Sequence, residues 1–302
     1  MKRLLFKLIL LASANAAVGL AILQLADARH SFEQWQTDSV LLATPRDTAF
    51  DMVILGASRV KLLTRIRSNL DCLQRELRMK VLGMASPFGG GIVPAQMYLS
   101  NFYERGNTAG IVLISLPPSI LFSRGPNQDH KIVYYEPFRF DFLLKMVRHG
   151  FGYRRIITYV RSKFTPAWLL QRPVPLANAW RTLTPEDVTP RRIQMRIDSM
   201  YTDGLDEARF KEYAKVFEDI LGMARGHGAR VVVIFAPTLL GEEPGTPKVR
   251  SLLAELGKRH AFEFYDFTNV LTDPSLYADL DHLNSKGAEQ FVTRCLKPVL
   301  IK

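Results

Sequence analysis

Short apolar runs alternate along most of the chain with segments whose apolar residues recur at helical spacing. The apolar runs lie at 51–55 (DMVIL), 79–82, 111–116 (IVLISL), 230–236 (RVVVIFA) and 262–266. The helical patterns lie at 60–77, 95–106, 209–225, 247–260 and 285–296. Continuous apolar strands that alternate with helices indicate a parallel sheet covered on both faces. The pattern therefore predicts an α/β domain, doubly wound around a mainly parallel five-stranded sheet.

The first part of the chain has a different pattern. Residues 4–26 are almost continuously apolar, interrupted by Lys7, and have the length of roughly 20 residues that crosses a bilayer. Lys2, Arg3 and Lys7 precede or begin this run and favour a cytoplasmic N-terminus. The small residues at 13–16 would also suit cleavage of a signal peptide, but the apolar run continues past them. We interpret 1–28 as a retained, single-pass anchor in the inner membrane, 29–48 as a tether and 49–302 as an extracytoplasmic, periplasmic domain.

An insertion at about 123–196 interrupts the alternation of strands and helices. Residues 124–200 contain 14 Lys and Arg against 6 Asp and Glu, a net charge of +8 within the chain's +11. Such a basic segment could face the membrane surface or an anionic glycan, or could simply be a solvated face. With a membrane anchor in the same chain, nucleic acid is not expected as a partner. We expect the insertion to cap the carboxyl edge of the sheet.

Three residue types that suit nucleophilic catalysis follow predicted strands. Ser58 comes directly after the first strand, and Asp279 and His282 lie in a polar loop after the fifth (YADLDHLNSKG). Loops at the carboxyl ends of parallel strands converge on one edge of the sheet. A serine needs a base to remove its proton, and the base needs a carboxylate that fixes its tautomer. Ser58, His282 and Asp279 could fill these roles; Asp281, adjacent to the histidine, is expected to point elsewhere.

These segments resemble the SGNH (GDSL-like) hydrolases. ILGASRV is similar to the first block of that family, which would make Ser58 the nucleophile, and DLDHLN is similar to the last block, Asp-x-x-His. The resemblance covers most of the chain outside the anchor and the insertion. It implies a flavodoxin-like SGNH fold, an acyl-serine intermediate and no cofactor.

The middle blocks of the family concern the oxyanion. VLGMASPFGGG resembles the second block, with Ser86 in the place of the usual glycine and Gly83 or Gly89 as alternatives. Only a backbone N–H is needed there, so Ser58 and Ser86 are the expected donors. The third block normally supplies an Asn, which LISLPPS lacks, so either Ser115 replaces it or that donor is absent. Arg59 could hold an anionic group of the substrate or form a structural ion pair.

At a finer level the chain resembles membrane-anchored SGNH proteins that modify cell-envelope polymers, such as the alginate O-acetyltransferase-like proteins. This resemblance implies a serine esterase or O-acyltransferase that acts on acyl esters of a glycan, with acetyl the expected group. It also implies a membrane-bound O-acyltransferase partner. The alternative is a catalytically weak or inactive scaffold of the same fold that binds an anionic polymer or that partner.

The chain has two cysteines, Cys72 and Cys295. A strand order of 2-1-3-4-5 would put the helices that carry them on one face of the sheet, and an exported location permits a disulfide between them. We therefore expect this disulfide. No metal site is expected, because two distant cysteines are too few and the other histidines lack ligand spacing.

Overall fold

The computed structural model describes residues 2–29, 37–85, 90–128, 130–165 and 181–301. A five-stranded parallel sheet forms its centre, in the order β2-β1-β3-β4-β5. The strands are β1 (Ala49–Gly56), β2 (Val81–Ala85), β3 (Thr108–Ser115), β4 (Arg230–Phe235) and β5 (Glu263–Asp266). The predicted α/β class, the five parallel strands and their order are confirmed.

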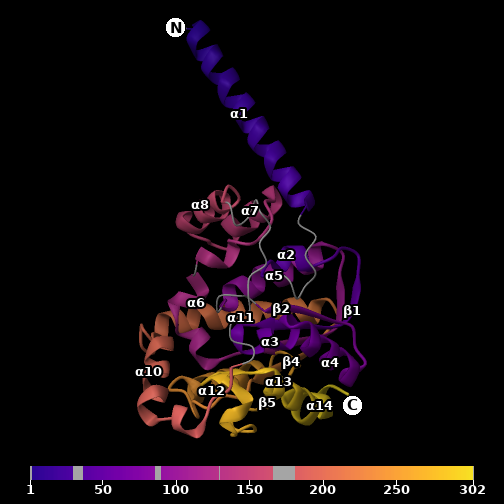
Figure 1. The fold of residues 1–302 in the computed structure, drawn as a ribbon, viewed down its shortest axis with the longest axis vertical. Coiled ribbons are helices and arrows are strands. Elements are labelled where there is room, and N and C mark those ends of the chain that lie inside the picture. The colour runs from indigo at the N-terminus through magenta and orange to yellow at the C-terminus, as the bar shows by residue number, and fades with distance from the viewer. Residues whose placement is uncertain (1, 30–36, 86–89, 129, 166–180, 302) are drawn as a thin grey trace.

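Helices cover both faces of this sheet (Figure 1). Alternate residues of each strand point to opposite faces, so Val53 and Leu55 of β1 enter one core and Met52 and Ile54 enter the other. The first core is closed by α5 (Ile92–Glu104), α11 (Glu207–Gly226) and α12 (Thr246–Leu256). The second is closed by α3 (Ser58–Arg65), α4 (Arg67–Leu77), α13 (Ser285–Phe291), a π-helical turn (Val292–Leu296) and α14 (Lys297–Leu300).

Two local features differ from the pattern in the sequence. The helix expected over 60–77 is divided at Ile66, whose backbone is extended, and the Asn69 amide donates to the Leu62 carbonyl at the break. The expected polar loop around His282 contains a short antiparallel ribbon, β6 (Tyr277–Asp279) and β7 (His282–Leu283). These strands are too short to give a periodic signal.

The insertion divides into two parts. The first comprises α6 (Arg124–Gln128), α7 (Phe140–Arg148) and α8 (Tyr153–Ser162), with α7 packed on α5. The second is α10 (Pro190–Met200), which contributes to the cavity at Ser58 described below. Among the described residues, short 3₁₀ turns lie at Pro118–Leu121, His130–Val133, Pro185–Asp187 and Pro274–Leu276.

The N-terminal helix α1 (Lys2–Arg29) extends away from the rest of the molecule (Figure 1). Its segment Lys2–Leu25 is long and apolar enough to cross a membrane. The helices α7 and α8 lie at the end of the domain that α1 joins. The chain re-enters the domain at α2 (Val40–Ala43).

Glu136 holds α2 on the domain. Its carboxylate is fully buried and accepts hydrogen bonds from the Ser39 hydroxyl, from the backbone N–H groups of Val40 and Leu41, and from the Tyr98 hydroxyl. Each oxygen therefore has two donors, which satisfies a group that is costly to bury otherwise. This contact joins the segment after α1 to the loop that precedes α7.

The disulfide expected between Cys72 and Cys295 is wrong. The helix α4 does pack against the π-helical turn, but both cysteines are free and buried. Burial raises the pKa of each thiol. Because the thiolate is the species that forms disulfides, this shift disfavours oxidation of either thiol.

We expect Glu136→Gln to lower the free energy of unfolding by about 2–4 kcal/mol, because an amide NH₂ would replace an oxygen that accepts from two donors. Urea unfolding of the full chain in detergent, followed by circular dichroism, measures this. Glu255→Gln is the matched control, since the Glu255 side chain is 67% exposed, and it should change the free energy by less than about 0.5 kcal/mol. Equal effects of the two substitutions would contradict the role of Glu136.

Candidate active site

Ser58 lies on a tight turn between β1 and α3. The strand ends at Gly56 and the helix begins at Ser58. Gly56 has φ +150°, and a Cβ there would lie 3.0 Å from the Cβ and the carbonyl oxygen of Ser115. A glycine is therefore required where β1 passes the end of β3. The turn places Ser58 at the carboxyl edge of the sheet.

The ribbon β6–β7 positions Asp279 and His282. The two residues are paired across the ribbon. Asp279 Oδ1 accepts from the backbone N–H of Asp281 at 3.1 Å and from that of His282 at 3.0 Å, which fixes the turn. The turn is also held to the loop after β4, because the Leu280 carbonyl accepts from the Leu239 N–H at 2.8 Å.

Asn284 ends the ribbon and begins α13. Its side chain accepts from the Gly287 N–H as the N-cap, and its amide donates to the Ser275 carbonyl at 2.8 Å. One short segment thus carries both the N-cap of α13 and the residues Asp279 and His282.

Ser58, His282 and Asp279 form a continuous hydrogen-bonded chain. The Ser58 hydroxyl lies 2.7 Å from Nε2 of His282, and Nδ1 of the same ring lies 2.8 Å from Asp279 Oδ1. With its proton on Nδ1, the neutral imidazole donates to Asp279 and accepts from Ser58. This is the geometry of a nucleophile, its base and the carboxylate that orients the base.

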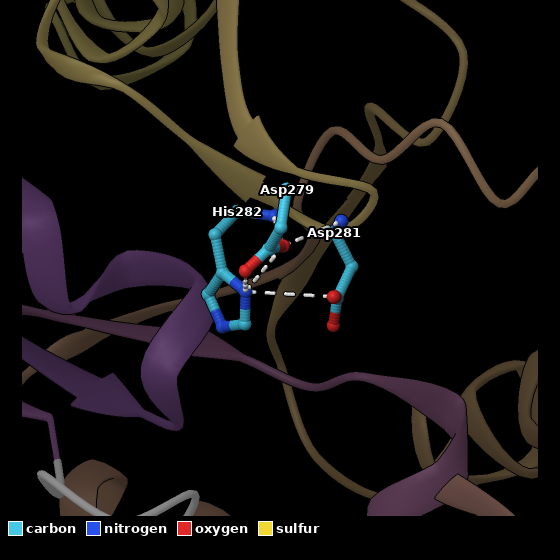
Figure 2. Close-up of side chains that lie close together, drawn as sticks. All are labelled: Asp279, Asp281 and His282. Carbon is cyan, nitrogen blue, oxygen red and sulfur yellow. Dashed lines mark hydrogen bonds and ion pairs between the residues drawn. The ribbon is translucent and has the colours of Figure 1, made fainter. Parts of the chain in front are cut away.

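A second carboxylate faces the same ring nitrogen. Asp281 Oδ1 lies 3.4 Å from Nδ1 of His282, and Figure 2 shows both carboxylates directed at this atom. We expected Asp281 to point away from the ring. Instead it is buried and held by two arginines: Arg196 of α10 binds both of its oxygens at 2.8 and 2.9 Å, and Arg59 Nε lies 3.5 Å away.

These charges control the ionisation of His282. Burial alone would lower the pKa of its imidazole, but hydrogen bonds and negative charge from Asp279 and Asp281 raise the pKa to about 9. Burial would raise the pKa of Asp281, but the hydrogen bond to His282 and the charges of His282 and Arg59 hold it well below its usual range. The site therefore stabilises an imidazolium strongly.

Arg59, a candidate for substrate binding, is buried and forms an ion pair. Its guanidinium lies 2.6 Å from Glu243 Oε1. Glu243 also accepts from the Tyr201 hydroxyl at 3.1 Å and from the Ser119 N–H at 3.3 Å. Burial lowers the pKa of Arg59, but Glu243 and Asp281 outweigh this and raise it. These contacts place Arg59 in a buried charge network, and Arg59 also lines the cavity beside Ser58 that is described next.

A cavity of about 470 Å³ opens beside Ser58. The polar residues that line it include Ser58, Ser119, Ser123, Arg196, Ser199 and Thr202. Ile120 and Met200 add apolar surface. Both parts of the insertion contribute: Ser123 and Gly125 from its start, and Arg196 and Ser199 from α10.

The candidates for the oxyanion site differ in position. Ser58 is the first residue of α3, where a backbone N–H has no acceptor within the helix. Ser86 and Gly89 lie outside the described residues. Gly83 is inside β2, paired with Ile54, and lines a different small cavity. The Ser115 hydroxyl is buried at the end of β3 and has no hydrogen-bond partner in the described part of the chain.

Asp279, Asp281 and His282 each offer a ligand atom within 4.8 Å of the others, so the group could hold a metal ion. Two features of the donors do not fit that role well. Asp281 already contacts the guanidinium groups of Arg196 and Arg59. The second ring nitrogen of His282, Nε2, lies at the Ser58 hydroxyl. We therefore interpret the group as an acid–base site.

Three contributors to the site were missed in the sequence: Arg196, Glu243 and Ser119. Each acts through a contact with a residue distant in the chain, and none belongs to a motif.

No protein-family model and no curated protein matches this chain.

The pKa of His282 gives a prediction for pH dependence. The base must be neutral to accept a proton, so kcat/KM for a small ester should rise with pH towards about 9. Asp281→Asn removes one negative charge near Nδ1 of His282, so the pH at which kcat/KM rises should become lower. Parallel pH–rate profiles and NMR titrations of the imidazole measure the shift. Asp71→Asn, at a side chain that is 48% exposed, is the control. If the midpoint of the pH–rate profile were the same in Asp281→Asn as in the wild type, Asp281 would not influence the pKa of His282.

Asp279→Asn should act on the tautomer of His282. An amide NH₂ facing Nδ1 favours the ring with its proton on Nε2, which cannot accept from Ser58, and kcat should fall by up to about 10⁴-fold. Steady-state hydrolysis of an acetyl ester measures kcat and KM separately. Asp198→Asn on the exposed side of α10 is the control. A loss confined to KM would contradict the proposed role of Asp279.

Proposed function

We propose that the protein is an SGNH-type serine hydrolase or O-acyltransferase that cleaves acyl esters through an acyl-serine intermediate. One observation carries the proposal. His282 Nε2 lies 2.7 Å from the Ser58 hydroxyl while its other nitrogen lies 2.8 Å from Asp279. A serine hydroxyl that has such a base beside it can be activated for nucleophilic attack.

In the first step, Ser58 Oγ attacks the carbonyl carbon of the acyl ester and His282 Nε2 takes its proton. The carbonyl oxygen becomes an oxyanion, which the N–H of Ser58 at the start of α3 stabilises. Asp279 and Asp281 stabilise the imidazolium. The tetrahedral intermediate then collapses: the bond from carbon to the alcohol oxygen breaks, and Nε2 returns its proton to the departing alcohol.

In the second step, a water molecule or a sugar hydroxyl attacks the acyl-serine. His282 takes the proton of the attacking oxygen and returns it to Ser58 Oγ as the acyl group leaves. Water gives the free acid, and a sugar hydroxyl gives a new ester. The same side chains therefore serve an esterase or a transferase.

The cavity supports a glycan ester as the substrate. Ser119, Ser123, Ser199 and Thr202 are among the residues that line it, and hydroxyl side chains can bind the hydroxyls of a sugar ring. A volume of about 470 Å³ accommodates a short acyl group such as acetyl with part of a sugar. We propose a polysaccharide of the cell envelope as the acyl acceptor or donor.

The N-terminal helix supports a location at the inner membrane. Its apolar segment Lys2–Leu25 would span the bilayer once, and Lys2 and Arg3 favour a cytoplasmic N-terminus. The catalytic domain would then face the periplasm. A membrane-bound O-acyltransferase is the partner that would deliver acyl groups to such a domain.

A specific observation favours a second candidate, a catalytically weak or inactive scaffold. The family's third-block Asn is absent, and the Ser115 hydroxyl proposed to replace it is enclosed at the end of β3. In that case the domain would bind an anionic polymer or the membrane partner without turnover.

Labelling with a fluorophosphonate probe separates the two candidates. The full chain in detergent should be labelled, and both Ser58→Ala and His282→Ala should abolish labelling. Ser58→Ala should also lower kcat for an acetyl ester by about 10⁶-fold, to below detection. Ser251→Ala, on the exposed side of α12, is the matched control and should keep both activities. An unlabelled wild-type chain would favour the scaffold.

A further inference from the structure

The helices α7 and α8 each expose a row of large apolar side chains. Phe140, Leu144 and Val147 recur on one side of α7, with exposed fractions of 66%, 43% and 57%. Tyr153 and Ile157 do the same on α8, at 68% and 47%, and Phe164 follows at 49%. We call these six residues the α7–α8 apolar surface. Large apolar side chains that are exposed on two contacting helices are a feature of interaction sites.

The surface does not result from loose packing. The opposite side of α7 is buried in the domain, with Phe142 and Met146 at 0% exposure. Tyr159 of α8 is also fully buried and contacts the Phe142 ring. The two helices are thus fixed to the domain by one set of apolar residues and present a second set outwards.

Basic residues accompany the exposed apolar side chains. Arg148 lies at the end of α7, and Arg154 and Arg161 lie on α8; all three are exposed. Helices that combine large apolar side chains with arginines suit the boundary between anionic lipid headgroups and acyl chains.

The connection to α1 keeps this surface near the bilayer. Ten peptide steps from Arg29 to Ser39 span at most about 35 Å. Ser39 is bound by Glu136, which precedes α7 by a few residues. Figure 1 shows α7 and α8 at the end of the domain from which α1 extends. A bilayer that holds α1 therefore lies within reach of the surface.

We propose that the α7–α8 apolar surface inserts into the outer leaflet region of the bilayer that α1 spans, with the three arginines at anionic headgroups. This inference rests on the membrane anchoring proposed above. It gives the domain a second attachment besides the tether. The domain would then have a fixed orientation, with Ser58 presented at a defined height above the lipid.

The membrane anchor of the same chain makes a lipid bilayer the expected partner of the α7–α8 apolar surface. The anchor keeps lipid beside the surface at all times, and the arginines complement anionic headgroups. A protein partner would have to be recruited separately. If the surface bound a protein partner, it would remain exposed to water when the membrane contains only lipid and this chain.

Site-specific fluorescence on the full chain tests the proposal. The native thiols are removed by Cys72→Ala and Cys295→Ala, and single cysteines are introduced as Val147→Cys, Ile157→Cys, Leu11→Cys and Met195→Cys. Each is labelled with an environment-sensitive fluorophore, and the chain is reconstituted in vesicles of phosphatidylethanolamine and phosphatidylglycerol. Met195 is the matched control, because it is an apolar residue of α10 with an exposed fraction of 59%.

Labels at 147 and 157 should emit at shorter wavelength and be quenched by a nitroxide on the lipid acyl chain, as should the label at 11. The label at 195 should show neither effect. Quenching at 11 without quenching at 147 and 157 would overturn this inference and leave the anchor in place. Quenching at none of the three positions would overturn both. Neither result would alter the esterase test on Ser58, so the two proposals fail separately.

Discussion

The contact between the Ser58 hydroxyl and Nε2 of His282 is the interaction on which the rest of the site depends. It joins residues 224 positions apart, at 2.7 Å. Two rigid elements bring them together: the turn at Gly56, which a side chain would obstruct, and the β6–β7 ribbon, which Leu239 holds through the Leu280 carbonyl. The sheet fixes the distance between these elements, so the fold as a whole maintains the hydrogen bond.

Three buried charges, Glu243, Arg59 and Asp281, and the partly exposed Arg196 form an alternating series next to this contact. Each charge has an opposite neighbour, which offsets the cost of removing it from water. Asp281 links this series to His282, whose Nδ1 also faces Asp279. Two carboxylates stabilise the imidazolium of the transition state, but they also stabilise it in the resting protein. The reaction is accelerated only to the extent that the carboxylates stabilise the transition state more than the resting protein.

The sequence was informative where a signal is local. Apolar runs such as IVLISL predicted the five strands, a doubly wound topology gave their order, and the motifs around Ser58 and His282 predicted which side chains would meet. Contacts that depend on distant segments could not be predicted. Arg196 reaches Asp281 from an insertion 85 residues away, and nothing in its local pattern distinguishes it from the other arginines. The free state of Cys72 and Cys295 likewise depends on side-chain placement between packed helices, which strand order alone does not determine.

An acyl group on Ser58 would be the most direct sign of the proposed chemistry. The full chain is incubated with an activated acetyl ester, quenched in acid during turnover, digested and analysed by peptide mass spectrometry. The account requires acetylation of the peptide that contains Ser58, and its absence when His282 is replaced by Ala. An unmodified Ser58 peptide while ester is being consumed, or acetylation that persists without His282, would contradict it.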